Sequence, residues 1–215
     1  MKRTLFPLIC LMALSLILAS GCRQQRVAEP VDPGIALAVA GFTQPDRVED
    51  LLAGTIPPGT ETATPAQLNQ LDNNLQTLIR TESKRSFKTA DETRECQETT
   101  LVTRRESQES ALAYWVNVGK CMKVEYLLVP QITYWRDRDG QEMGVNQPAS
   151  VILDMYVVDV AGDGLVSRFH FDESQVSLSE NLLTMDKFLS RGGKWVTAVE
   201  LASEGLKLGL QKLGL

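Results

Sequence analysis

Residues 124–135 read VEYLLVPQITYW, a run rich in β-branched and aromatic side chains that is typical of one long strand. Pro130 lies inside this run. A proline has no backbone N–H to give to a sheet, so Pro130 predicts an edge position or a bulge at that point.

Two more strands follow the first one. Residues 149–160 read ASVILDMYVVDV, in which Asp154 and Asp159 stand among residues suited to a core. Residues 162–164 read Gly-Asp-Gly, a hairpin-turn signal. Residues 165–171, LVSRFHF, then alternate, with one face formed by Leu165, Phe169 and Phe171 and the other by Arg168 and His170. Three strands joined in this way predict an antiparallel meander.

The segments before the meander predict one short strand and two helices. Residues 35–42 are apolar and predict a buried strand. Thr64 and Gln67 form a helix-start pattern, and leucines at spacings of three and four then predict a helix over residues 65–82. Residues 89–106 are strongly polar and predict a loop or an edge. A second helix is expected from Ser107 to Gly119.

A last helix is predicted after the meander. Thr197 and Glu200 have the spacing of a capping box, and the helix should run to about residue 213. The expected fold is therefore α/β (α+β): a mixed, largely antiparallel sheet with a C-terminal three-strand meander and helices packed against it. Residues 35–215 should form a single domain, since this length suits one core.

The N-terminus has the pattern of a secretory signal peptide over residues 1–21. Lys2 and Arg3 form a basic start, and an apolar run follows that is shorter than the roughly 20 residues of a membrane-spanning helix. Small residues, Ala19 and Gly21, close the run, as a signal peptidase requires.

Residues 18–22, LASGC, resemble a bacterial lipobox, in which the cysteine thiol is alkylated with diacylglycerol and the chain is cut before it. The resemblance implies that Cys22 is lipidated and, with acyl chains such as palmitate, anchored in a bilayer. Lipoboxes usually carry Leu where this chain has Ala19. The alternative is a plain signal peptide that leaves Cys22 as an ordinary thiol. Arg23, in place of the Asp typical of inner-membrane retention, implies the outer membrane, facing the periplasm.

Residues 22–34 are polar, contain prolines and predict a flexible tether behind the lipid. Removal of residues 1–21 would take away two of the 22 basic residues and none of the 27 acidic ones, so the mature net charge would be about −7. This charge argues against a nucleic-acid partner. His170 is the only histidine, which argues against a histidine-based metal site or a Ser-His pair. No cofactor or metal is expected.

Cys96 and Cys121 remain as a candidate disulfide in an oxidising compartment. The bridge would close a loop of about 25 residues and stabilise the fold by roughly 3.5 kcal/mol on the chain-entropy model. The alternative is a pair of buried free thiols.

Residues 171–182, FDESQVSLSENL, form the most unusual polar stretch and are the candidate partner-docking surface. The docking residues expected there are Asp172, Glu173, Gln175, Ser179, Glu180 and Asn181. The alternative is that they cap helices and hydrogen-bond within loops. His170 with Asp172 and Glu173 is a candidate acid–base group, or a surface histidine bonded to a neighbour.

The order of elements resembles the compact α/β domain of periplasmic proteins such as the N-terminal part of TolB and the outer-membrane lipoproteins CsgG and LpoB. From about residue 36 to the end, the chain also resembles a group of bacterial outer-membrane lipoproteins. The segments that carry this second resemblance are residues 126–131, 148–151, 171–175, 178–182 and 192–198. The resemblance implies a domain that docks partners or builds assemblies, with no catalytic residues to carry over.

The sequence thus predicts a non-enzymatic, lipid-anchored envelope protein. It would act in assembly or partner docking at the outer membrane, with an envelope protein as partner and the bilayer held through acylated Cys22. The first alternative is a periplasmic module that binds a glycan or a lipid. The second is a hydrolase that uses His170 and Asp172.

Overall fold

The computed structural model describes residues 31–32, 34–83, 85–176 and 185–215. The expected signal peptide, Cys22 and most of the tether lie outside these residues, as do Ser179, Glu180 and Asn181. No helix in the described ranges is long and apolar enough to cross a membrane.

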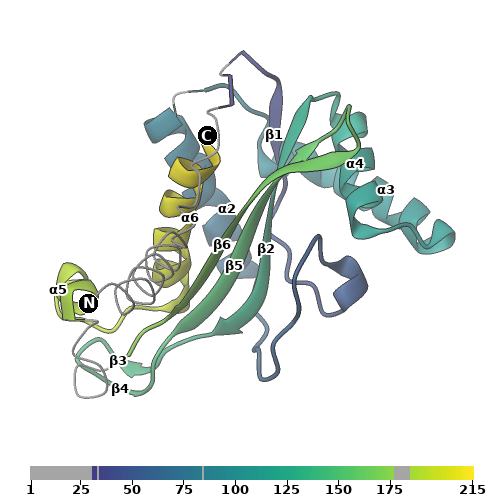
Figure 1. The fold of residues 1–215 in the computed structure, drawn as a ribbon. Coiled ribbons are helices and arrows are strands. Elements are labelled where there is room, and N and C mark those ends of the chain that lie inside the picture. Colours follow the sequence, from purple (N-terminus) through teal and green to yellow (C-terminus); the bar gives the residue numbers. More distant parts are fainter. Residues whose placement is uncertain (1–30, 33, 84, 177–184) are drawn as a thin grey trace, which may run out of the picture.

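A four-stranded mixed sheet forms the centre of the molecule, in the order β1-β2-β5-β6 (Figure 1). β1 (Leu37–Val39) runs parallel to β2 (Tyr126–Arg136). β5 (Ser150–Asp159) and β6 (Gly164–Ser174) follow in antiparallel pairings. The predicted fold class and the predicted meander of β2, β5 and β6 are confirmed.

Pro130 lies just beyond the part of β2 that has neighbours on both sides. β1 pairs with β2 only from Tyr126 to Leu128, and further along a single bridge joins Thr43 to Gln131. The missing N–H of Pro130 therefore falls where the neighbouring strand has already ended. A register shift follows between Ile132 and Tyr134.

The first face of the sheet is covered by α2 (Pro65–Leu78) and α6 (Ala198–Leu213), which lie together in Figure 1. Both helices begin at the predicted capping boxes, at Thr64 and Thr197. A five-residue π-helical turn, Ile79–Ser83, continues α2. Gly205 lets α6 approach the sheet closely, because a Cβ there would lie 2.7 Å from the ring of Phe171.

The second face is covered near one end by α3 (Ala90–Ser107) and α4 (Ala111–Met122). The predicted loop over residues 89–106 is wrong, because this segment is helix α3. Its N-terminus is capped by Thr89, whose side chain accepts from Glu92 N while the Glu92 side chain accepts from Thr89 N. A cap and tertiary contacts thus form a helix that has no apolar stripe.

Cys96 of α3 and Cys121 of α4 are joined in the expected disulfide. α4 does not end at Gly119 as predicted but continues to Met122. Gly119 instead provides a close contact, since a Cβ there would collide with Val160.

β6 differs from its predicted alternation at its start. A register shift pairs Val158 with Leu165 but Val157 with Ser167. Leu165 therefore lies on the same face as Val158, opposite to Phe169 and Phe171. A small hairpin of β3 (Asp139–Gln141) and β4 (Gly144–Gln147), a 3-10 turn (Val48–Asp50) and α5 (Met185–Ser190) complete the described elements.

Candidate functional site

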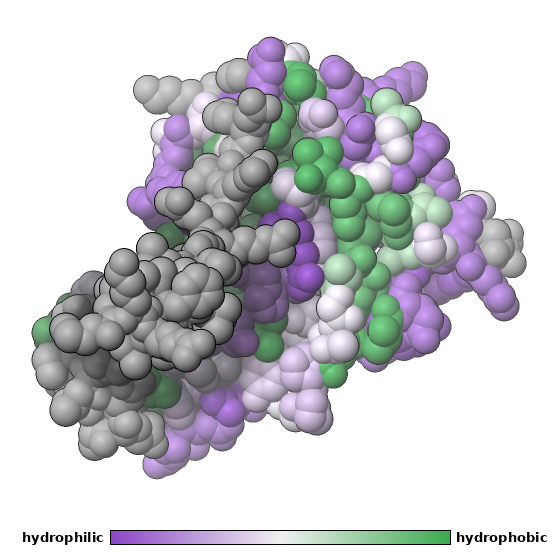
Figure 2. Space-filling view, viewed as in Figure 1, coloured by the Kyte–Doolittle hydropathy of each residue, from purple (hydrophilic) through white to green (hydrophobic). Residues whose placement is uncertain are grey.

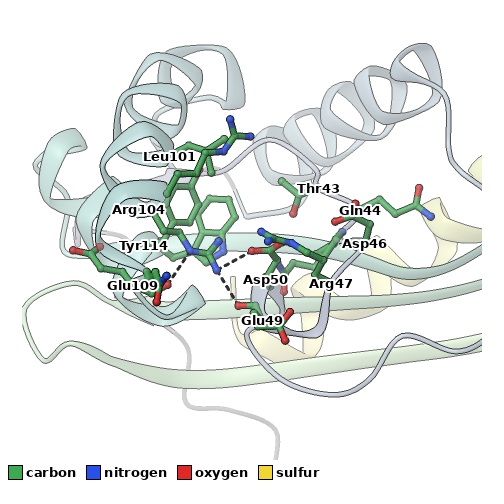
Figure 3. A pocket seen from close by; sticks show the side chains of 15 residues that line it. Thr43, Gln44, Asp46, Arg47, Glu49, Asp50, Leu101, Arg104, Glu109 and Tyr114 are labelled. Carbon is green, nitrogen blue, oxygen red and sulfur yellow. Dashed lines mark hydrogen bonds and ion pairs between the residues drawn. The ribbon is translucent and has the colours of Figure 1, made fainter.

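A groove of about 940 Å³ lies between residues 43–50 and the junction of α3 with α4 (Figure 3). Its volume is in the range of ligand pockets. Three distant parts of the sequence build it: the segment after β1, the two helices and Gln131 of β2. We call it the Arg104 groove, after the side chain that joins its walls.

Arg104 of α3 links the two walls of the groove. Its Nη2 lies 2.8 Å from the carboxylate of Asp50 and donates to Glu49 O at 2.9 Å. Its Nε donates to Glu109 O at 3.1 Å, and its guanidinium lies 5.4 Å from the ring centroid of Tyr114. The side chain is only 11% exposed, so these partners replace most of its water.

Gln131 holds the other wall in place from the sheet. This buried side chain donates to Asp50 O at 3.1 Å and accepts from Leu52 N at 3.0 Å. Two backbone groups of an irregular segment are thereby satisfied by one amide. Residues 48–52 consequently keep a defined position against Arg104.

Tyr114 closes the floor of the groove beside Trp115. Its hydroxyl donates to Gln97 O at 3.0 Å, and burial raises its pKa to about 12. The phenol therefore stays protonated at neutral pH and serves as a fixed donor within the protein. The two rings meet edge to face at 4.8 Å between centroids.

The remaining lining is polar and of both charge signs. Arg47 is 67% exposed on one wall, and Arg105 is exposed on the other. Acidic side chains stand among them: Asp46, Glu49, Asp50 and Glu109. The Thr43 hydroxyl oxygen is buried with no hydrogen-bond partner in the described residues. Such a lining offers directional hydrogen bonds to a polar ligand or to a peptide segment.

Residue patterns alone do not reveal this groove. Residues 43–50 precede Arg104 by more than fifty residues, and only the tertiary fold brings Asp50 to Arg104. The one local signal was the capping pattern of Thr89 and Glu92, which places Arg104 on a helix.

A second polar cluster lies on the same face of the sheet, around the buried carboxylate of Asp154. One oxygen, Oδ1, lies 2.8 Å from Arg168 Nε and 2.9 Å from His170 Nδ1. The hydrogen bond to Asp154 raises the pKa of Arg168. The other oxygen, Oδ2, is buried without a hydrogen-bond partner in the described ranges. The acid that His170 contacts is thus Asp154 and not Asp172, because Asp154 is its cross-strand partner.

The structure describes three of the predicted docking residues: Asp172, Glu173 and Gln175. Asp172 is exposed on β6. Glu173 pairs with Lys187 at 2.6 Å and with Arg191 at 3.5 Å. Gln175 is only 2% exposed, and it donates to Lys194 O and accepts from Val196 N. As a buried tie between loops, Gln175 offers no surface to a partner, which corrects the expectation for that residue.

Metal ligands do not gather anywhere in the described residues: no group of three or more His, Cys, Asp or Glu side chains could hold an ion there.

No protein-family model matches the sequence. No curated protein matches it either.

Several solved structures resemble the fold. A PelC dodecamer from Paraburkholderia phytofirmans is 12% identical, with 89% of this chain and 96% of that chain covered and a TM-score of 0.48. The LpoB C-terminal domain from Salmonella enterica is 12% identical, covering 69% and 88%, with a TM-score of 0.37. Lipoprotein GNA1162 from Neisseria meningitidis is 8% identical, covering 74% and 98%, with a TM-score of 0.37. These values do not establish a family for this chain.

Proposed function

We propose that the protein is a non-enzymatic lipoprotein of the cell envelope, anchored through Cys22, whose folded part docks a protein partner in the Arg104 groove. The observation that carries the anchor is the sequence LASGC at residues 18–22 behind a signal-peptide pattern. The observation that supports docking is the groove itself, with exposed charged residues around an internally paired arginine.

The charge pattern favours a peptide-like partner. Arg104 is paired with the Asp50 carboxylate and donates to Glu49 O and Glu109 O, so its charge is largely balanced within the groove wall. Arg47 and Glu49 at the rim are exposed and of opposite sign. A polypeptide segment carries alternating donors and acceptors and matches such a mixed rim better than a strongly charged small molecule does.

Site-directed photocrosslinking in intact cells tests the docking proposal. A photoreactive amino acid at Glu49, on the rim, should trap one protein partner in a defined band. The same amino acid at Asn73, exposed on α2 away from the groove, is the matched control. A band of equal strength at both positions, or none at Glu49, would remove the groove as the docking site.

A second candidate, a module for a glycan or a lipid, is supported by the volume of the groove and by the aromatic floor of Tyr114 and Trp115. Native mass spectrometry of the detergent-extracted protein distinguishes the two. A bound glycan or lipid adds a discrete mass to the protein. This mass should be lost in Thr43→Trp, because the larger side chain fills the groove. Protein docking predicts no such mass.

A hydrolase based on His170 has weaker support. Within the described residues the imidazole of His170 bonds to Asp154 and lies 3.5 Å from Arg168. These contacts place no nucleophilic side chain beside the imidazole.

A further inference from the structure

β6 is the last strand of the sheet and its outer side is open among the described residues. Figure 1 shows it at the end of the sheet opposite to β1. The face of the molecule drawn in Figure 2 carries both hydrophilic and hydrophobic residues, so it is not uniformly polar. Four residues of the strand are exposed at alternate positions: Arg168, His170, Asp172 and Ser174.

The backbone of these four residues points away from the sheet. Gln175 N donates to Ala149 O at 3.1 Å, so the odd-numbered residues of β6 bond toward β5. In an antiparallel ladder, neighbouring residues bond alternately to opposite sides. The N–H and C=O groups of Arg168, His170 and Asp172 therefore face outward, available to another strand.

Two of the devices that usually prevent such pairing are missing from the strand. Its eleven residues, GLVSRFHFDES, contain neither proline nor lysine. The register shift affects only its start, near Leu165. Two large apolar side chains, Leu165 and Val166, are 41% and 52% exposed there.

We propose that β6 pairs with β6 of a second copy of this chain, antiparallel and with the two-fold axis at His170. In this register Arg168 lies opposite Asp172 of the second copy, and Asp172 opposite its Arg168. Two opposite-charge pairs then flank the axis, while every outward backbone group of the centre finds a partner. Arg168 bonds to Asp154 through Nε, and its side chain keeps 37% exposure for the contact.

Charge disfavours two of the other registers that would pair the outward backbone groups. An axis at Arg168 would place the two arginines face to face, and an axis at Asp172 would do the same to the two carboxylates. Like charges directly opposite each other destabilise a strand pair. The edge is therefore complementary in charge to a second copy of itself in this register. The inference does not depend on the lipid anchor or on the Arg104 groove.

Cysteine crosslinking of the full-length chain tests the proposal. At the axis, the two Cα atoms of residue 170 would lie about 5.5 Å apart, within reach of a disulfide. In His170→Cys, mild oxidation of intact cells should give a covalent dimer. In Asp172→Cys, an equally exposed control, the two cysteines would lie about 13 Å apart and should stay unlinked.

Comparing covalent dimer formation in the two cysteine variants tests both the self-pairing and its register. A dimer with His170→Cys alone supports the proposed register. No dimer with either variant, in protein whose thermal unfolding matches the parent chain, refutes self-pairing, whether β6 is free or occupied by another protein. A dimer with Asp172→Cys alone refutes the register.

A charge reversal tests the same register independently. Asp172→Arg should weaken dimerisation in detergent about tenfold, measured by analytical ultracentrifugation. Unchanged dimerisation would contradict the charge pairing.

Discussion

At the residue scale, Arg104 has partners on three segments: Asp50 and Glu49 before the helices, Glu109 between α3 and α4, and Tyr114 within α4. Its removal leaves the Asp50 carboxylate, 20% exposed, with the exposed Arg47 as its remaining ion-pair partner among the described residues. Loss of one partner from a largely buried pair costs more than loss of a surface pair.

Arg104→Met should therefore lower the free energy of unfolding by about 2–3 kcal/mol. Arg105→Met, at the exposed neighbouring position, should change it by less than about 0.5 kcal/mol. Urea unfolding followed by tryptophan fluorescence measures both. Equal, small effects would show that Arg104 does not hold the walls together.

The tyrosines give the stability a defined dependence on alkaline pH. Burial raises the pKa of Tyr114 and of Tyr156 to about 12, against about 10 in an unfolded chain. Between these values the unfolded state loses the phenolic proton while the folded state keeps it. Stability is thus fully present below pH 10 and falls as pH rises from about 10 to 12.

The expected loss is at most about 1.4 kcal/mol per pH unit for each tyrosine. In Tyr156→Phe, which also loses the hydrogen bond to Ala53 O, the slope should be smaller. Urea unfolding at pH 9, 10 and 11 measures it. An unchanged slope in the variant would contradict the assignment to Tyr156.

At the element scale, the contact of α6 with the sheet depends on Gly205. A Cβ there would lie 2.7–3.1 Å from three ring atoms of Phe171, itself only 9% exposed. Gly205→Ala should lower the unfolding free energy by about 1–3 kcal/mol despite the better helix propensity of Ala. Gly144→Ala, where nothing lies within 4 Å, is the control. Stabilisation by Gly205→Ala would show that the ring moves aside freely.

α3 depends on its disulfide more than the other helices do. Its ties to the rest of the fold include Thr93, which donates to Val39 O, Gln97, which accepts from Gly41 N, Arg104 and the bridge from Cys96 to Cys121. Reduction should lower stability by roughly 3.5 kcal/mol. Hydrogen exchange should accelerate in α3 much more than in α2. Uniform acceleration over both helices would show that the bridge stabilises the whole fold and not this element.

The four strands of the central sheet and three of the helices could be predicted because their signals are local, whereas the small hairpin of β3 and β4 was not predicted. Val124–Trp135 has strand composition, and Thr64 and Thr197 begin helices with recognisable caps. α3 could not be predicted from apolar period, since its residues are polar all round. Leu165 was placed on the wrong face because a bulge changes which side chains point inward, and alternation alone does not show a bulge.

At the scale of the whole molecule, we propose different roles for two surfaces: the Arg104 groove near α3 and α4, and the edge of β6. The groove joins segments far apart in the sequence, and the contact of Asp154 with His170 depends on the register of two neighbouring strands. Strand register and helix docking decide such contacts, so residue patterns alone could not show them. The expected docking stretch was predicted from polarity, and Gln175 shows that polar residues also serve as buried ties.

With the proposed anchor, the folded domain would stay close to the membrane surface, and its groove and strand edge would face the periplasm. Both proposed surfaces gain from this restriction, because tethered copies and partners meet at high local concentration. The account therefore depends first on the chemistry of one cysteine.

Mass spectrometry of the mature N-terminal peptide tests that chemistry most directly. The account predicts a chain that begins at Cys22 and carries diacylglycerol on its sulfur, with none of residues 1–21 remaining. A chain that begins elsewhere, or at an unmodified Cys22, would contradict the anchor and with it the proposed place of the protein in the envelope.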